Sequence, residues 1–127
     1  MKRVLMAALA VSVAACGSSN TNPSGTNNGG SSNPATTITI TSSGVSPKTL
    51  TVSRGTQVTV VNNDTRAHAL ASDPHPTHEN CPELNTWGSL NSGQSRQSSN
   101  LNTARSCGYH DHDLPTNTSL QGTIIIQ

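Results

Sequence analysis

The chain contains no phenylalanine, and Trp87 and Tyr109 are its only large aromatic residues. A folded core must therefore be built from isoleucine, valine and leucine, and a thin aliphatic core suits a β-sandwich better than a helix bundle. Basic residues are also few, and lysine and arginine form no cluster or stripe. Because contacts to phosphates need clustered positive charge, this absence disfavours nucleic-acid binding.

Thioethers and catalytic motifs are also missing from most of the chain. Both methionines, Met1 and Met6, lie within the first six residues. No Gly-x-Ser-x-Gly turn occurs, and no pair of acidic residues stands in a recognisable catalytic arrangement. We therefore expect a protein that is not an enzyme and whose folded part offers no methionine sulfur.

The N-terminal segment has the pattern of an export signal. Lys2 and Arg3 precede an apolar run that is about a dozen residues long, which is typical of a signal peptide and too short to span a bilayer. The run ends in Val-Ala-Ala-Cys16 and resembles the bacterial lipobox, in which the cysteine is lipidated and becomes the new N-terminus. We expect residues 1–15 to be a lipoprotein signal peptide and Cys16 to be the anchor. The alternative is an ordinary signal peptide that happens to contain a cysteine.

Residues 16–36 are almost entirely glycine, serine, asparagine, threonine and proline. Such a segment buries too little apolar surface to offset its ordering entropy, so we expect a disordered, flexible tether behind the lipid anchor. Its lipid would hold the protein on the periplasmic side of the cell envelope. Gly17 is not the aspartate that retains Gram-negative lipoproteins in the inner membrane, which favours the outer membrane.

Residues 37–127 are enough for one small domain. Residues 37–41, 57–61 and 122–126 alternate or are rich in β-branched side chains, which predicts strands. Turn signals separate them from other short apolar runs, and no helical periodicity occurs. We expect an all-β sandwich of about seven strands, with one long irregular segment from residue 73 to 86.

The residues that bind metals gather in one part of this domain. All five histidines and two of the three cysteines lie between positions 68 and 112; they are His68, His75, His78, Cys81, Cys107, His110 and His112. A thiolate and imidazoles from separate strand ends are the ligands that a small β-sandwich supplies to copper. Metal binding is therefore the leading interpretation, and Asp111 and Asp113 flank His112 where they could orient an imidazole.

Three short patterns resemble the cupredoxins, the blue-copper family. Asn62-Asn63 precedes His68, Cys107 is followed at the third position by His110, and Leu120 precedes a terminal Gly-x-Ile strand. The resemblance implies a Greek-key β-sandwich that binds copper through His68, Cys107 and His110, with Leu120 at the axial position. Because the loop after Cys107 is long, His112 is the alternative to His110. The implied function is a one-electron carrier or a copper-handling protein that meets a redox or copper-delivery partner.

A second interpretation remains open. In an oxidising compartment, Cys81 and Cys107 could form a disulfide, which would leave no thiolate for copper. The domain would then be a disulfide-stapled periplasmic binding or structural module. It would hold a metal through histidines alone, with all five histidines as candidates, or hold no metal. In either interpretation, His75, His78 and Cys81 are weaker site candidates than His68, Cys107, His110 and His112.

Overall fold

The computed structural model describes residues 35–127. The expected signal peptide, the expected lipidation at Cys16 and nearly all of the expected tether lie outside these residues. Within them, no helix has the length and apolar character needed to cross a membrane. The sequence expectations for residues 37–127 can therefore be compared with the structure, whereas those for the membrane anchor remain predictions.

The described residues form nine strands and two short 3-10 helices. The strands are β1 (Thr37–Thr41), β2 (Gly44–Ser46), β3 (Thr49–Val52), β4 (Thr59–Asn62), β5 (His68–Ser72), β6 (Gly88–Leu90), β7 (Ser95–Gln97), β8 (Arg105–Asp111) and β9 (Gly122–Ile126). The 3-10 helices are η1 (Pro82–Thr86) and η2 (Thr118–Leu120). The all-β fold predicted from the sequence is thus confirmed, with more strands than the seven or so expected.

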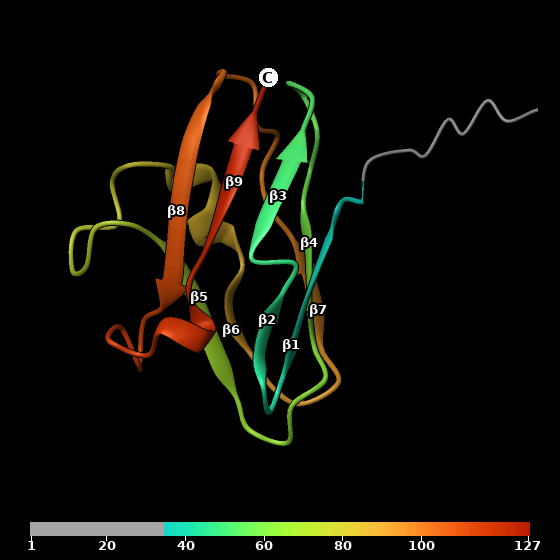
Figure 1. Cartoon of the computed structure of the whole chain (residues 1–127), viewed down its shortest axis with the longest axis vertical. Coiled ribbons are helices and arrows are strands. Elements are labelled where there is room, and N and C mark those ends of the chain that lie inside the picture. Colours follow the sequence, from blue (N-terminus) through green and yellow to red (C-terminus); the bar gives the residue numbers. More distant parts are fainter. Residues whose placement is uncertain (1–34) are drawn as a thin grey trace, which may run out of the picture. The chain divides into compact units, whose positions relative to one another are not determined.

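The strands make two sheets (Figure 1). One sheet has the order β2-β1-β4-β7, and the other has the order β3-β9-β8-β5-β6. Each sheet is mixed, because β1 pairs with β4 and β3 pairs with β9 in parallel, while the other pairs are antiparallel. This arrangement is the two-layer sandwich that alternating short strands predict.

The core between the sheets is mostly aliphatic, as the composition requires. Ile38 and Ile40 of β1 are fully buried, and Thr39 between them is partly exposed, so this strand follows the predicted alternation. Trp87 is fully buried in the core and donates a hydrogen bond from Nε1 to the Val58 carbonyl at 3.0 Å. Tyr109 packs edge-on against it with ring centroids 5.7 Å apart. The two aromatic residues therefore act as packing groups.

Strand β8 determines where the candidate ligands point. Its buried positions Cys107 and Tyr109 face the core, whereas Ser106 and Gly108, which alternate with them, face outward. His110 continues the outward row and is nevertheless buried, because the segment after β5 covers this part of the sheet. That segment is the yellow-green loop that lies beside β8 in Figure 1. The outer face of β8 is therefore buried at His110, although Ser106 on the same face is exposed.

Candidate metal centre

Cys107 does not offer a free thiolate. It is joined to Cys81 by a disulfide with a Cα–Cα distance of 5.8 Å, and both cysteines are fully buried. Cys81 directly precedes η1, so the bond ties the loop after β5 to the middle of β8. The expected thiolate ligand at Cys107 is therefore wrong for this structure, and the disulfide of the second interpretation is present.

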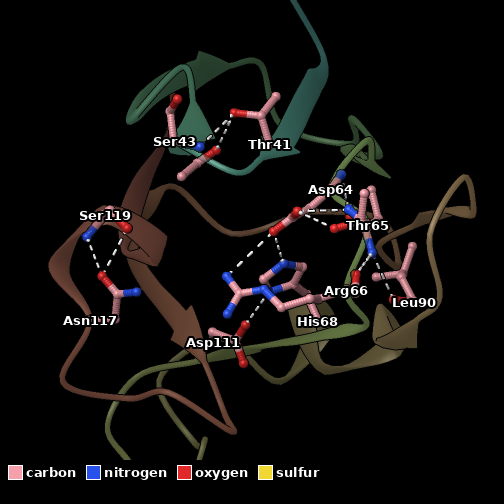
Figure 2. A network of polar contacts seen from close by, with 12 residues as sticks. Thr41, Ser43, Asp64, Thr65, Arg66, His68, Leu90, Asp111, Asn117 and Ser119 are labelled. Atoms are coloured by element: carbon pink, nitrogen blue, oxygen red, sulfur yellow. Dashed lines mark hydrogen bonds and ion pairs between the residues drawn. The ribbon is translucent and has the colours of Figure 1, made fainter.

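His68 is engaged elsewhere. Figure 2 shows its ring between two carboxylates, with Nδ1 at 2.6 Å from Asp111 Oδ2 and Nε2 at 3.0 Å from Asp64 Oδ2. All three side chains are buried. Asp64 is further held by the backbone N–H of Thr65 at 2.7 Å. Since both ring nitrogens already have close partners, His68 has no lone pair directed at a metal in this arrangement.

The geometry of β5 and β8 explains why the expected ligands do not meet. Side chains alternate between the two faces of a strand, so Cys107 and His110, three positions apart, point to opposite faces of the sheet. Leu70 lies opposite Asp111, and continuing this antiparallel register places Cys107 opposite Pro74. His68 is six positions from Pro74, which is roughly 20 Å along a strand. The set of His68, Cys107 and His110 is not brought together.

The outer face of β8 carries a different cluster. One ring nitrogen from each of His75, His78 and His112 lies within 4.8 Å of the other two. His75 and His112 are exposed, and His78 is half-buried. His78 Nε2 lies 2.8 Å from His112 Nδ1. Three imidazoles that converge in this way can supply nitrogen ligands to one transition-metal ion.

Backbone hydrogen bonds hold the loop that carries His75 and His78. Asp73 donates its N–H to the Gly108 carbonyl at 2.9 Å, which continues the β5–β8 ladder into the loop. Asn80 N–H reaches the Asp73 carbonyl at 3.0 Å and closes the loop upon itself. His112 donates its N–H to the Ala69 carbonyl at 2.7 Å. Both sides of the cluster are therefore fixed to the same pair of strands.

His78 is the most constrained member of the cluster. It has a φ of 53°, in the left-handed region that residues other than glycine seldom adopt. Asn85 donates to its carbonyl at 2.8 Å, and its own Nδ1 donates to the Ser72 carbonyl at 2.7 Å. Because Nδ1 carries the hydrogen of that bond, a neutral His78 presents the Nε2 lone pair to His112. Strain of this kind is frequent at binding sites.

The surroundings of His75 favour its neutral imidazole. Desolvation, followed by the charges that His112, His110 and His78 would carry, lowers the pKa of His75 below its ordinary value of 6.5. A lowered pKa keeps the His75 lone pair available when the pH falls slightly below that value. The proximity of the rings thus favours the protonation state that a metal ion requires.

The other residues that the sequence suggested for the site lie outside the cluster of three histidines. His110 lies beside the cluster, with ring centroids 5.0 Å from His78 and 5.5 Å from His75. Leu120 is buried in the hydrophobic core at the end of η2. Asp111 orients His68 and not His112, while Asp113 is exposed.

Sequence reasoning missed the roles of Asp64 and Asp73. Asp73 accepts a hydrogen bond from His110 Nδ1 at 2.5 Å, across 37 positions of sequence. The Asp73-Pro74-His75-Pro76-Thr77-His78 segment did signal a constrained histidine loop, because proline fixes φ and lowers the entropy cost of ordering. Nothing in the sequence signalled that this loop folds onto the outward residues of β8.

Comparisons with known proteins identify the fold. No protein-family model matches the chain, and no curated protein matches it. Among solved structures, a purple cupredoxin from Nitrosopumilus maritimus has a TM-score of 0.56 and 20% identity, and the match covers 72% of this chain and 98% of that one. Oxidised plastocyanin from Dryopteris crassirhizoma has a TM-score of 0.56 and 15% identity, over 72% and 99% of the two chains. Amicyanin from Paracoccus versutus has a TM-score of 0.58 and 18% identity, over 73% and 81%. The described part of this chain is a domain with the cupredoxin fold.

Proposed function

We propose that this domain binds one copper ion through His75, His78 and His112 and handles copper in the cell envelope. The observation that carries the proposal is the convergence of three imidazole nitrogens to within 4.8 Å of one another. Nothing else among the described residues gathers three metal-binding side chains so closely. The loop and β8 hold these histidines before any ion arrives, so little ordering entropy is lost on binding.

The ligand chemistry and the fold both favour copper. Imidazole nitrogens suit copper and zinc, and divalent copper binds a given nitrogen site more tightly than the other first-row divalent ions. The matched proteins include a purple cupredoxin and a structure of an amicyanin variant described as Cu(I). These relationships support copper as the metal for this site.

The accessibility of the site supports copper handling over electron transfer. Two of the three imidazoles are exposed, so a partner protein could approach the ion directly. Cys107 cannot provide a thiolate–copper bond, because its sulfur is part of the disulfide. We propose buffering of copper, or its delivery to a partner protein, as the role, and the proposal assigns no catalysis to the domain.

The location of this activity is part of the proposal. The apolar run before Cys16 supports export and lipidation at that cysteine, and residues 16–36 supply a tether of on the order of 25 Å root-mean-square length. The domain would then sample a small volume at the periplasmic side of the outer membrane. In cells given a labelled fatty acid, the wild-type chain should carry the label and sediment with membranes. A Cys16→Ser variant that still carries the label would contradict this location.

Copper titration of the purified protein, produced without a histidine tag, tests the proposed site. The wild type should retain one copper per chain after dialysis. Single His75→Ala, His78→Ala and His112→Ala variants should each bind more weakly, and the triple variant should retain none. Thr77→Ala is the matched control, because Thr77 is exposed in the same loop and carries no metal-binding atom.

The control should bind copper as the wild type does. Equal copper retention by the triple variant and the wild type would refute the proposed site. Loss of folding in a variant is recognised separately from its thermal unfolding curve, recorded without metal.

A further inference from the structure

His110 has an unusual environment beside the three clustered histidines. It is only 2% exposed, and its Nδ1 lies 2.5 Å from Asp73 Oδ1. Its other ring nitrogen, Nε2, is buried and has no hydrogen-bond partner. Buried polar atoms in folded proteins are nearly always paired, so an unpaired one calls for a functional explanation.

Asp73 fixes which nitrogen of His110 is free. A carboxylate only accepts hydrogen bonds, so Nδ1 carries the hydrogen and a neutral His110 keeps its lone pair on Nε2. Carboxylates and carbonyls orient metal-binding histidines through the same contact in many proteins. His78 receives the equivalent support from the Ser72 carbonyl. Two neighbouring imidazoles are thus held in the tautomer that presents Nε2.

The position of the Asp73 carboxylate requires a glycine at residue 108 of β8. A Cβ atom added to Gly108 would overlap Asp73 Oδ2. Glycine in a strand interior weakens the strand, so its presence indicates a close approach by another group. Here that group is the carboxylate that orients His110. Gly108 of β8 therefore leaves room for the Asp73 carboxylate, and that carboxylate in turn orients His110.

The spacing of the rings fits four imidazoles around one ion. With metal–nitrogen bonds of about 2.0 Å, ring centroids around a tetrahedral ion lie about 5 Å apart. The ring centroid of His75 lies 5.5 Å from that of His78, 5.5 Å from that of His110 and 5.1 Å from that of His112. The ring centroid of His78 lies 5.0 Å from that of His110 and 4.9 Å from that of His112. Five of the six pairs in the set of four therefore have ring centroids close to the expected spacing, while the nitrogens of His110 fall outside the group whose members all lie within 4.8 Å of one another.

We propose that His110 is the fourth imidazole ligand of the metal site and that Asp73 is its positioning residue. This inference rests on the proposed function, since it adds a ligand to the same site. The resulting centre has a buried end at His110 and an exposed end at His75 and His112. A copper ion that first binds the exposed imidazoles of His75 and His112 would then also bind the buried, oriented imidazole of His110.

X-ray absorption and pulsed electron paramagnetic resonance of the copper-loaded protein test this proposal by counting imidazoles. The wild type should show four. His110→Gln, which keeps a side chain of similar length in the buried site, should show three and bind copper at least 10-fold more weakly. Asp73→Asn should keep four imidazoles but bind about 10- to 100-fold more weakly, because outer partners of metal ligands have effects of that size.

A measurement on the metal-free protein shows whether Asp73 positions His110 or only supports the fold. Nitrogen NMR of the apo protein should show His110 with its hydrogen on Nδ1 and a bare Nε2, and Asp73→Asn should change this tautomer balance. Thr77→Ala should leave the ligand count, the affinity and the tautomer unchanged.

The outcomes distinguish the two proposals. A wild type with three imidazoles, together with a His110→Gln variant of unchanged affinity, would overturn the fourth ligand and leave the three-histidine site standing. A wild type that retains no copper would overturn the proposed function and this inference with it.

Discussion

At the scale of single residues, His68 is a structural group. Its two ring nitrogens face Asp64 and Asp111, and all three side chains are buried (Figure 2). An imidazolium donates from both nitrogens, which is the hydrogen-bonding pattern that two carboxylates require. Since Asp64 follows β4 and Asp111 ends β8, the histidine links the two sheets at one end of the sandwich.

Replacement of His68 by alanine should therefore destabilise the fold. Two buried carboxylates would lose their shared partner, and breaking a buried charge pair in this way costs about 3–5 kcal/mol of unfolding free energy. Urea unfolding measures the loss. Copper stoichiometry at low temperature should stay at one per chain, and a folded His68→Ala variant that no longer binds copper would contradict the separation of this group from the metal site.

Asp64 should also shape the acid stability of the domain. Its hydrogen bond to His68, then the Thr65 N–H, lowers the pKa of the Asp64 carboxyl from 3.8 to about 2. A carboxyl whose pKa is lower in the folded state stabilises the fold fully above pH 3.8, and this contribution disappears as the pH falls towards 2. Unfolding free energy measured between pH 2 and 6 should fall more steeply for the wild type than for Asp64→Asn. Parallel curves for the two proteins would contradict this role.

At the scale of elements, the disulfide joins the two parts that carry the histidines. Cys81 ends the loop with His75 and His78, and Cys107 lies in β8, which carries His110 and leads into His112. Both parts of the proposed metal site therefore depend on one covalent link within the core.

Removal of this link in a Cys81→Ser/Cys107→Ser variant should weaken both the fold and the site. The bond closes a segment with a sequence separation of 26, for which chain entropy gives about 3–4 kcal/mol of stabilisation. Copper affinity should fall as well, because the freed loop must be ordered on binding. Denaturant unfolding and copper titration measure the two effects, and unchanged values in both would contradict the role given to the disulfide.

The sequence predicted the sheets better than the site, and β8 shows why. The alternation in β1 and the β-branched run in β9 directly reflect which side chains face the core. In β8, His110 and Asp111 are both buried, although their polarity resembles that of a loop. His110 is buried by a loop from a distant part of the chain, and Asp111 is buried by its contact with His68. Neither partner can be recognised from the local sequence pattern around β8.

At the scale of the whole molecule, the chain keeps the cupredoxin fold but assembles its histidines on the outer face of a sheet. The inner position expected for a thiolate is taken by the Cys81–Cys107 disulfide, and His68 serves the sandwich itself. One fold can support different sites, and here the loop after β5 and the C-terminal end of β8 carry the proposed ligands. The central claim is that this domain holds copper by imidazoles and not by a thiolate.

The most direct test of that claim is the visible and electron paramagnetic resonance spectrum of the purified protein loaded with one equivalent of Cu(II). The account predicts bound copper with nitrogen hyperfine structure, weak visible absorption and loss of the signal in the triple variant of His75, His78 and His112. An intense thiolate-to-copper band that disappears in Cys107→Ser would contradict it.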